Sequence, residues 1–275
     1  MSLIDCAIVW DPSIGPFSVF GFDIRYYSLC WVIGLVGAYY IVGKLYKKSG
    51  VSDELFDPLF MYCFAGIIIG ARLGHCLFYQ PEYYLSHPIE MLLPIKQTAD
   101  GWVFSGYEGL ASHGGVIGVI TALLLYVRKT KLTMVWTLDN IAVAAPFFSA
   151  MVRIGNFMNS EIIGTETNLP WGVIFVQAGE TQPHHPAQLY EAIAYFVIFL
   201  FGLLLYKKYK AKIGSGLFMG YCLFTIFTFR FFVEFIKENQ VPFEDGMTLI
   251  MGQWLSIPLI IVGAYFMIKG IKKSA

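Results

Sequence analysis

The segment at residues 141–164, "IAVAAPFFSAMVRIGNFMNSEIIG", joins an apolar run directly to a polar one. Its first half, residues 141–152, has the composition of a helix that lies in lipid. Its second half holds an arginine, a glutamate, two asparagines and two glycines. An ionisable side chain at membrane depth costs at least about 2.5–3.5 kcal/mol, so such side chains usually mark a functional site. The segment therefore predicts a membrane helix that ends in a site for a charged ligand.

Composition favours a membrane protein over the whole length of the chain. Of the 275 residues, 57% are hydrophobic and only 14% are charged, and the mean hydropathy is +0.62. Soluble domains carry roughly 25% charged residues, and a helix of about 20 apolar residues crosses a bilayer. We predict an all-α integral membrane protein, a single domain over residues 1–275, with a bundle of about seven transmembrane helices. The expected spans are residues 26–43, 59–79, 112–127, 134–152, 188–206, 214–236 and 249–268.

Basic residues predict the orientation of this bundle. They cluster after every second expected span, and such clusters mark the cytoplasmic side. The N-terminus is therefore expected outside and the C-terminus in the cytoplasm, with residues 80–111 and 153–187 as two structured extracytoplasmic loops. The motif "WGVIFV" at residues 171–176 is expected to form a short strand. The clustered basic residues are Lys44, Lys47, Lys48, Arg128, Lys129, Lys131, Lys207, Lys208, Lys210, Lys212, Lys269, Lys272 and Lys273.

Charge and cysteine content argue against several other classes of protein. The formal net charge is zero, so no nucleic-acid partner is expected. The five cysteines show no CxxC spacing, so neither a disulfide framework nor a zinc site is expected. The first residues lack a basic region followed by a clean apolar run, so no cleavable signal peptide is expected.

Glycines four residues apart predict one close contact between helices. Gly66, Gly70 and Gly74 form a ridge of small residues in the second span, which lets a neighbouring backbone approach. Arg72 lies beside this ridge, which favours a packing role over a direct chemical one. Asp139 is expected to orient its helix near the cytoplasmic side.

Several other polar residues of the spans and loops have more than one interpretation. Arg230 and Glu234 lie four residues apart on one helix face, so they can form an ion pair. That pair either orients two helices or belongs to a site. Glu191 and Gln188 could cap the start of the fifth span, where the helix dipole favours a carboxylate. His184 stands on a predicted loop and is expected to be an ordinary surface residue.

The other candidate site residues gather on the outer side of the predicted topology. Two arginines and a histidine at the outer leaflet, with hydrogen-bonding groups around them, predict a site for an anionic headgroup. The planar guanidinium matches phosphate oxygens at two points, and glycines allow close backbone approach. The residues that gather there are His113, Arg153, Asn156, Glu161, His185, Arg230 and Glu234.

The same motifs resemble those of a known enzyme family. "RIGNFMNSEIIG" is similar to the signature of the prolipoprotein diacylglyceryl transferases, and "GARLGHCLFY", "HGGVIG", "HPAQLYE" and "FRFFVEF" resemble further blocks of that family in the same order. The resemblance covers residues 20–260, roughly. It implies an enzyme of the bacterial cytoplasmic (inner) membrane that takes phosphatidylglycerol and prolipoprotein signal peptides from the lipid bilayer. The diacylglyceryl group would pass to the lipobox cysteine thiol, with release of glycerol phosphate, as the first step of lipoprotein maturation.

The resemblance and the chemistry together suggest roles for the site residues. A thiol must lose its proton to become a nucleophile, and histidine titrates near neutral pH. His113 is therefore expected to act as general base, with a positioning role or a place in an interfacial turn as alternatives. Arg153 and Arg230 would stabilise the leaving phosphate, and Tyr27, in "RYYSL", could donate to it. No metal or diffusible cofactor is expected. Substrate binding is also assigned to Asn156, Asn159, Glu161, Gly164, His185 and Glu234.

Two other classes of membrane protein remain as alternatives. Intramembrane arginine, glutamate and histidine also mark the pathways of transporters for anionic solutes. Transporters commonly show two related halves, and no internal repeat is visible here. An intramembrane serine protease would need a nucleophilic serine in a glycine-rich turn. The "GSG" at residues 214–216 is expected at a cytoplasmic helix start instead.

Overall fold

A computed structural model describes residues 7–13, 15–19, 22–98, 101–105, 109–239, 244 and 246–273. By internal contacts, the chain forms two compact units. Unit 1 comprises residues 1–45 and 135–275, and unit 2 comprises residues 46–134. Unit 2 is thus continuous in sequence and separates the two parts of unit 1. The single domain expected from the sequence stays a prediction.

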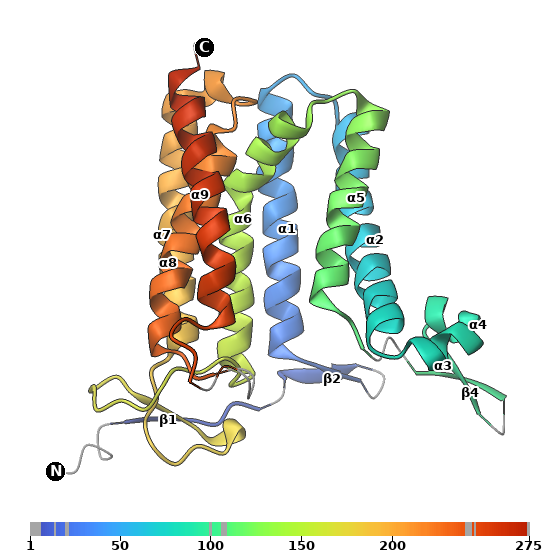
Figure 1. Cartoon of the computed structure of the whole chain (residues 1–275), viewed down its shortest axis with the longest axis vertical. Coiled ribbons are helices and arrows are strands. Elements are labelled where there is room, and N and C mark those ends of the chain that lie inside the picture. Colours follow the sequence, from blue (N-terminus) through green and yellow to red (C-terminus); the bar gives the residue numbers. More distant parts are fainter. Residues whose placement is uncertain are drawn as a thin grey trace. The chain divides into compact units, whose positions relative to one another are not determined.

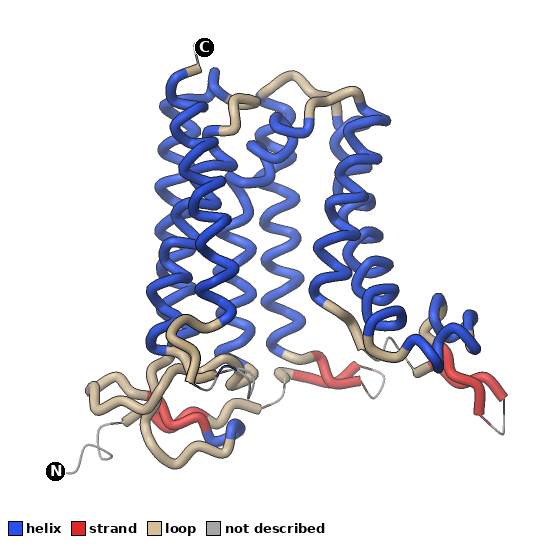
Figure 2. The backbone as a smooth tube through the Cα atoms, in the orientation of Figure 1, coloured by secondary structure: helices blue, strands red, loops and turns tan. Residues whose placement is uncertain are grey.

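Unit 1 is a bundle of long apolar helices with a buried hydrophobic cluster near one end of them. Leu45, Val143, Tyr206, Leu217 and Phe218 form a buried hydrophobic cluster that joins four of these helices. The helices run side by side in Figure 1, and the strands of unit 1 all lie at one end of them in Figure 2. The helices are α1 (Tyr26–Lys48), α6 (Met134–Met158), α7 (Ala187–Tyr209), α8 (Leu217–Val233) and α9 (Met251–Lys272). The last three residues of α1 and the first residue of α6 belong to unit 2.

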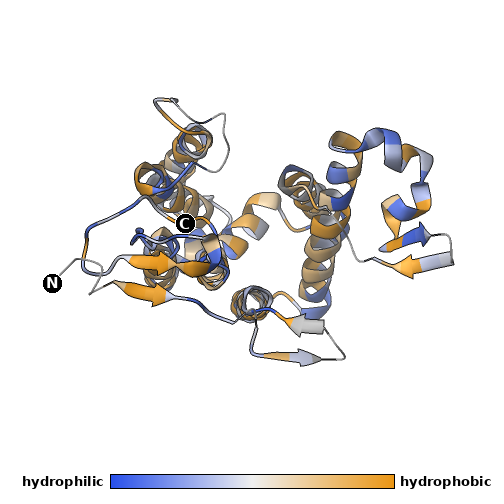
Figure 3. Cartoon of the chain, turned by 90° about the horizontal axis from the view of Figure 1, so that it is seen from below, coloured by the Kyte–Doolittle hydropathy of each residue, from blue (hydrophilic) through white to orange (hydrophobic). Residues whose placement is uncertain are grey.

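Short strands and 3-10 turns complete unit 1. The strand expected in "WGVIFV" is confirmed as β6 (Val173–Phe175), which pairs in parallel with β1 (Ile8–Trp10). In Figure 3, these two strands lie side by side at the same end of unit 1. The other elements are β2 (Phe17–Val19) and β3 (Phe22–Ile24), which pair antiparallel, and the 3-10 turns η2 (Val176–Ala178), η3 (Lys210–Lys212) and η4 (Glu234–Ile236).

Unit 2 is a helix pair with a small module at one end. Its long helices are α2 (Asp53–Phe78) and α5 (Ser112–Thr130). The segment between them was expected to be structured, and the described part of it is. It holds α3 (Pro81–Ser86), α4 (Pro88–Leu92) and the antiparallel pair β4 (Ile95–Thr98) and β5 (Gly101–Phe104).

The predicted glycine ridge on α2 is confirmed as the contact with α5. A Cβ built on Gly70 would lie 2.3 Å from the carbonyl oxygen of Gly114, and one built on Gly66 would lie 2.6 Å from that of Gly118. The two backbones therefore touch, which side chains larger than hydrogen would prevent. Arg72 ties this contact to the end module, because it donates to the backbone oxygens of α4, with 2.7 Å to Glu90. That geometry agrees with the packing role favoured by the sequence.

The glycine contact gives a matched pair of variants. The Gly118→Ala variant should lower the thermal midpoint in detergent, because its Cβ would lie 1.9 Å from the Gly66 oxygen and force the helices apart. Gly115→Ala is the control, since the nearest atom to its Cβ is 3.6 Å away. Alanine also favours helix over glycine by about 0.8–1 kcal/mol. Equal midpoints for the two variants would show that close packing of α2 on α5 contributes little.

Membrane-spanning character agrees with the sequence expectation. Among the described residues, six helices are long and apolar enough to cross a bilayer: α1, α2, α6, α7, α8 and α9. The expected seventh span, residues 112–127, is helical as α5 but is not among the six. In Figure 3, much of the ribbon of these helices has the orange colour of hydrophobic residues. The chain is therefore a multi-pass helical membrane protein.

Asp139 anchors α8, as the sequence suggested. Its two carboxylate oxygens accept hydrogen bonds from the backbone N–H groups of Gly214, Gly216 and Met219, at 2.8–2.9 Å. The carboxylate therefore caps the start of α8, where unpaired N–H groups and the positive end of the helix dipole meet. The "GSG" segment is accordingly a turn at a helix start, as expected.

The boundary expected at residue 152 is wrong, because α6 continues through Arg153 to Met158. The polar residues do not end the helix, since they find partners within the bundle. Arg153 pairs with the buried Glu191 of α7, and Gly155 leaves room for the ring of Tyr27 from α1. The site therefore begins on a rigid helix and not in a loop.

Candidate active site

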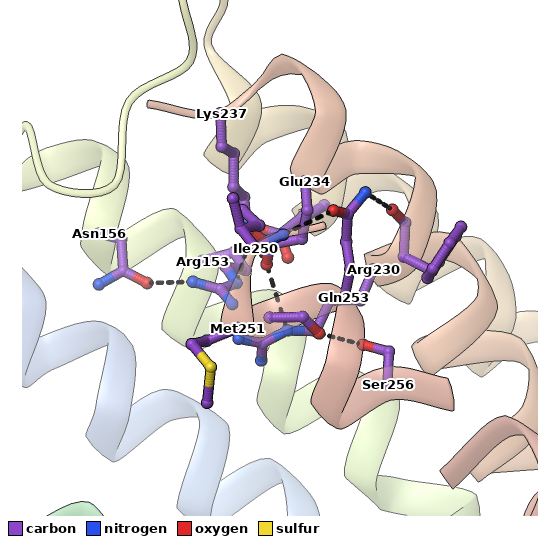
Figure 4. Close-up of polar contacts among 12 residues, drawn as sticks. Arg153, Asn156, Arg230, Glu234, Lys237, Ile250, Met251, Gln253 and Ser256 are labelled. Carbon is purple, nitrogen blue, oxygen red and sulfur yellow. Dashed lines mark hydrogen bonds and ion pairs between the residues drawn. The ribbon is translucent and has the colours of Figure 1, made fainter. Parts of the chain in front are cut away.

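A cavity of about 210 Å³ lies in unit 1 where the polar ends of α6, α8 and α9 meet. We name it the arginine pocket, because both candidate arginines of the sequence analysis line it. In Figure 4, Arg153 projects from α6 with Asn156 hydrogen-bonded to it, and Arg230, Glu234 and Lys237 lie nearby at the end of α8 and beyond. The lining residues are Arg153, Ile162, Arg230, Glu234, Lys237, Glu244, Ile250, Met251, Gly252 and Leu255.

Five charged side chains at the arginine pocket form an alternating chain of ion pairs. The Nε of Arg153 lies 3.1 Å from Glu191 Oε2, which in turn lies 2.9 Å from Lys237 Nζ. The same Nζ lies 3.2 Å from Glu234 Oε1, and that oxygen is 3.3 Å from the Nε of Arg230. Each carboxylate of this chain thus lies between two cations, so the arginines are held in place, and Glu244 is a third carboxylate in the lining.

Burial distinguishes the two arginines. The side chain of Arg153 is 12% exposed and its partner Glu191 is fully buried, whereas Arg230 is 37% exposed. Arg153 is therefore fixed by the bundle, and Arg230 has the freedom to adjust to a ligand. Charged pairs in a setting of low dielectric act more strongly on a bound anion than they would in water.

The signature residues after Arg153 form a second polar chain. Arg153 Nη1 donates to Asn156 Oδ1 at 3.2 Å, and Asn156 Nδ2 donates to Glu161 Oε2 at 3.2 Å. Asn159 Nδ2 donates to the other oxygen of Glu161 at 3.1 Å. Gln188 Nε2 donates to the backbone oxygen of Glu161 at 2.6 Å. The structure therefore brings Asn156, Asn159 and Glu161 together, but as supports of Arg153 and not as lining of the arginine pocket.

The backbone after α6 adopts an uncommon conformation. Ser160 and Ile162 have φ angles of 53° and 59°, in the left-handed region that non-glycine residues avoid. Such residues cost about 1–3 kcal/mol each and tend to cluster at functional sites. The turn directs Ile162 into the lining of the arginine pocket.

Gly164 holds the segment that carries Lys237. It forms a β-bridge with Lys237, and its N–H donates to the backbone oxygen of His185 at 2.9 Å. A Cβ at Gly164 would lie 2.6 Å from the backbone oxygen of Ile236, so only glycine allows this approach. The structure thus gives Gly164 a packing role beside the site, and its predicted substrate contact stays a prediction.

The start of α9 adds positive potential to the arginine pocket. Ile250, Met251 and Gly252 line it from the N-terminal end of a helix that runs to Lys272. A Cβ at Gly252 would lie 2.7 Å from the carboxyl carbon of Glu234, so glycine lets the helix end approach this carboxylate. The N-terminal end of a helix carries about half a positive charge and favours bound anions.

None of the five histidines lines the arginine pocket. His113 is exposed in the first turn of α5 in unit 2, so its part in the site stays a prediction. His185 is half-buried, with Nδ1 3.2 Å from the hydroxyl of Tyr190, and burial lowers its pKa. The surface position expected for His184 is wrong, because this side chain is only 2% exposed. His184 lies inside the 159–186 segment and forms β-bridges with Val173 and Glu166 of the same segment.

Two residues of the ion-pair chain, Lys237 and Glu191, are not predicted from the sequence as site residues. Lys237 is not among the candidate residues predicted from the sequence, and Glu191 is predicted there only as a possible helix cap. Lys237 follows Arg230 by seven residues and Glu234 by three, so all three share one helix face if the helix continues. That spacing is the signal that could have found Lys237. No comparable signal exists for Glu191, whose charged partners Arg153 and Lys237 come from other segments, although the hydroxyl of Tyr195, four residues on in α7, also donates to it at 2.9 Å.

Known proteins are similar to this chain over nearly its whole length. The sequence profile of the prolipoprotein diacylglyceryl transferase family matches residues 16–269. A phosphatidylglycerol–prolipoprotein diacylglyceryl transferase of Bacteroides fragilis is 56% identical, covering 98% of this chain and 97% of its own. Proteins of the same name from Chloroherpeton thalassium and Porphyromonas gingivalis are 39% and 40% identical, and each alignment covers at least 95% of both chains. The chain therefore belongs to the prolipoprotein diacylglyceryl transferase family, and it is a membrane-bound transferase of lipoprotein biosynthesis.

Proposed function

We propose that this enzyme transfers the diacylglyceryl group of phosphatidylglycerol to the lipobox cysteine thiol of prolipoproteins, with release of glycerol phosphate. The relatives carry this activity in their names. The observation that supports the proposal here is the arginine pocket, in which two guanidinium groups from different helices line one cavity. Membership of the family also favours a transferase over the transporter and the protease that the sequence left open.

The arginine pocket suits a phosphate headgroup and not a whole lipid. Its volume of about 210 Å³ is below the roughly 300–1,000 Å³ of sites that enclose drug-sized ligands. The headgroup would enter while the acyl chains stay in the membrane. Arg153 and Arg230 would each donate to phosphate oxygens, with Lys237 and the start of α9 as further sources of positive charge.

The chemistry is a displacement at the glycerol carbon that carries the phosphate. The thiolate sulfur forms a bond to this carbon while the bond from carbon to the phosphoester oxygen breaks. The electron pair of that bond leaves with glycerol phosphate, so negative charge grows beside the arginines. Preorganised cations stabilise such charge without reorganisation at the moment of reaction. The ion-pair chain supplies that preorganisation, because it holds Arg153 in place before the lipid binds.

The outer face of the cytoplasmic membrane is the proposed location of the arginine pocket. Within unit 1, the basic residues of α7, η3 and α9 lie at the C-terminal ends of these helices. The arginine pocket lies at their other end, where α7 and α9 begin. Since basic clusters face the cytoplasm, the N-terminus would be outside and the C-terminus inside.

The transfer assay tests the proposed function directly. Purified enzyme in detergent receives phosphatidylglycerol and a synthetic lipobox peptide, and mass spectrometry follows the peptide. We expect a mass increase of one diacylglyceryl group on the cysteine, and none on a peptide with serine at that position. Phosphatidylethanolamine serves as the control lipid, because its headgroup carries a compensating positive charge. Equal transfer from both lipids, or no transfer from phosphatidylglycerol, would reject the proposal.

The pH dependence of one variant tests His113 as general base. The His113→Gln variant should lose about 100-fold or more in transfer near pH 7, because base catalysis contributes about 10²–10⁴. The loss should shrink as the pH approaches 9, since a free thiol ionises unaided near pH 8.5, roughly. The measurement is the rate of peptide modification from pH 6 to 9, with wild type beside it. A defect of constant size across this range would assign His113 to structure or positioning.

A further inference from the structure

Gln253 is a buried polar side chain that lies directly beside the arginine pocket. It is 2% exposed, and it follows Gly252, the last of three successive α9 residues in the lining. Figure 4 draws it together with the residues of the pocket. A buried amide destabilises a protein unless its polar atoms are hydrogen-bonded. The partners of Gln253 therefore show what this side chain holds together.

The amide of Gln253 connects the start of α9 to the end of α8. Its Oε1 accepts a hydrogen bond from the backbone N–H of Ile250 at 3.0 Å, and its Nε2 donates to the backbone oxygen of Phe231 at 3.3 Å. Ile250 directly precedes α9 and Phe231 lies in the last turn of α8, where backbone groups run out of helical partners. One buried side chain thus satisfies a backbone group at each of the two helix ends.

Glycines hold α8 and α9 together far from the arginine pocket. A Cβ built on Gly263 would lie 2.5 Å from the backbone nitrogen of Phe224, and one built on Gly270 would lie 2.7 Å from the Cα of Leu217. Gln253 is about 15 Å along α9 from Gly263, at 1.5 Å per residue. The glycine contact therefore leaves the start of α9 to be fixed by other groups, and Gln253 bonds to α8 there.

The start of α9 in turn limits where the carboxylate of Glu234 can lie. A Cβ at Gly252 would be 2.7 Å from the carboxyl carbon of Glu234, so the α9 backbone lies directly against this group. Glu234 Oε1 is 3.3 Å from the Nε of Arg230. Because the Arg230 side chain is 37% exposed, packing restrains it little, and this ion pair contributes more to its orientation.

We propose that Gln253 is a positioning residue for lipid binding. It fixes the start of α9 against α8, and through Gly252 and Glu234 it holds Arg230 in the orientation that binds the lipid phosphate. The inference rests on the proposed function, which supplies the phosphate. Without the two hydrogen bonds of Gln253, the start of α9 can move away from Glu234 and leave Arg230 less well oriented. A donor that is oriented in advance binds more tightly than one that must be ordered when the ligand arrives.

The affinity of the Gln253→Met variant for phosphatidylglycerol tests the proposal. Methionine has about the same length and volume as glutamine, so it fills the same space but makes neither hydrogen bond. The dissociation constant is measured on the purified full chain that elutes as a single folded species. We expect affinity to fall about 5- to 10-fold, which is less than for Arg230→Ala, because Arg230 keeps its charge and its donors.

Thr225→Val is the matched control for this measurement. It also removes a side-chain hydrogen-bonding group from the α8–α9 pair. The hydroxyl of Thr225 donates within its own helix, to the backbone oxygens of Tyr221 at 2.8 Å and Cys222 at 3.4 Å. Because it bonds to no other helix and does not line the arginine pocket, this variant should bind phosphatidylglycerol like wild type.

Two further readouts separate positioning from a general structural role. In an Arg230→Ala background, Gln253→Met should weaken lipid binding no further, since the group that it positions is gone. In the transfer assay, Gln253→Met should raise the KM for phosphatidylglycerol and leave the KM for the lipobox peptide unchanged. A residue that merely stabilises the bundle would lower the folded fraction and leave both constants of the folded enzyme as they are.

Three results would overturn the proposal: wild-type affinity in Gln253→Met, an equal further loss in the Arg230→Ala background, or a parallel rise of both KM values. If Gln253→Met does not fold, Gln253→Asn replaces it, because its shorter amide cannot reach both Ile250 and Phe231, and the same outcomes apply. Absence of transfer by every enzyme, wild type included, would reject the proposed function. The lipid affinities would still decide the role of Gln253, so the two failures are distinguishable.

Discussion

Replacing Arg153 with alanine is expected to lower transfer to the lipobox peptide by about 100- to 1,000-fold, the loss typical when one preorganised donor to a developing negative charge is removed. The variant should still fold. Its buried partner Glu191 keeps a second cation, because Lys237 Nζ lies 2.9 Å from the same carboxylate oxygen. The measurement is kcat/KM for phosphatidylglycerol on enzyme that elutes as a single folded species. Arg128→Ala is the matched control, since Arg128 is an exposed arginine at the far end of α5 from His113.

Arg153→Lys separates charge from geometry at the same position. Lysine keeps the positive charge but loses the planar pair of donors that binds two phosphate oxygens and Asn156 together. We expect its activity to fall between that of wild type and Arg153→Ala. Full activity of Arg153→Ala would show that this guanidinium does not bind the leaving group.

The Lys237→Met variant should lose about 3–5 kcal/mol of unfolding free energy, the cost of breaking a buried ion pair by removing one partner. The side chain of Lys237 is 2% exposed and its Nζ serves both Glu191 and Glu234. Without it, two buried carboxylates would face each other with one arginine each. The measurement is unfolding in detergent by a chemical denaturant, or the recovered folded fraction if the variant is too unstable.

The stability of a double variant distinguishes the effect of lost charge balance from the effect of lost packing. Lys237→Met combined with Glu234→Gln removes one charge of each sign, so part of the stability should return. Lys237→Arg should keep most of it, because the charge remains. If the double variant is no more stable than Lys237→Met alone, the ion-pair chain contributes little and the methionine simply packs badly.

Much of the fold followed from local pattern. Runs of apolar residues located the seven long helices of the part of the chain that the structure describes, and the spacing of Gly66, Gly70 and Gly74 located the contact of α2 with α5. Apolar runs and glycine spacing depend only on residues that are close in sequence, so the sequence alone reveals them. The end of α6 could not be located in this way, because Glu191, the partner that Arg153 finds inside the bundle, lies on another helix.

The candidate site could also be predicted only in part, because some of its features depend on sequence neighbours and others on residues of other helices. Arginines, amides and carboxylates beside apolar runs stand out, so Arg153 and Arg230 were found, and they line one cavity. The burial of Glu191 and of His184 depends on the folded surroundings, and nothing adjacent in sequence indicates it. The sequence also could not show which residues line the arginine pocket and which only hold Arg153 in place. Asn156 and Glu161 belong to the second group because of hydrogen bonds that are seen only in the folded chain.

The central claim is that Arg153 and Arg230 bind the phosphate of one phosphatidylglycerol molecule, and lipid binding to purified enzyme tests it most directly. Affinity is measured for wild type, Arg153→Ala, Arg230→Ala and the double variant, with Arg128→Ala as control. Each single site variant should bind about 10- to 100-fold more weakly, as expected for a hydrogen bond to a charged group. The double variant should lose less than the product of the two single losses, because both groups contact one phosphate. Unchanged affinity in both single variants, or losses that multiply fully, would contradict a shared phosphate.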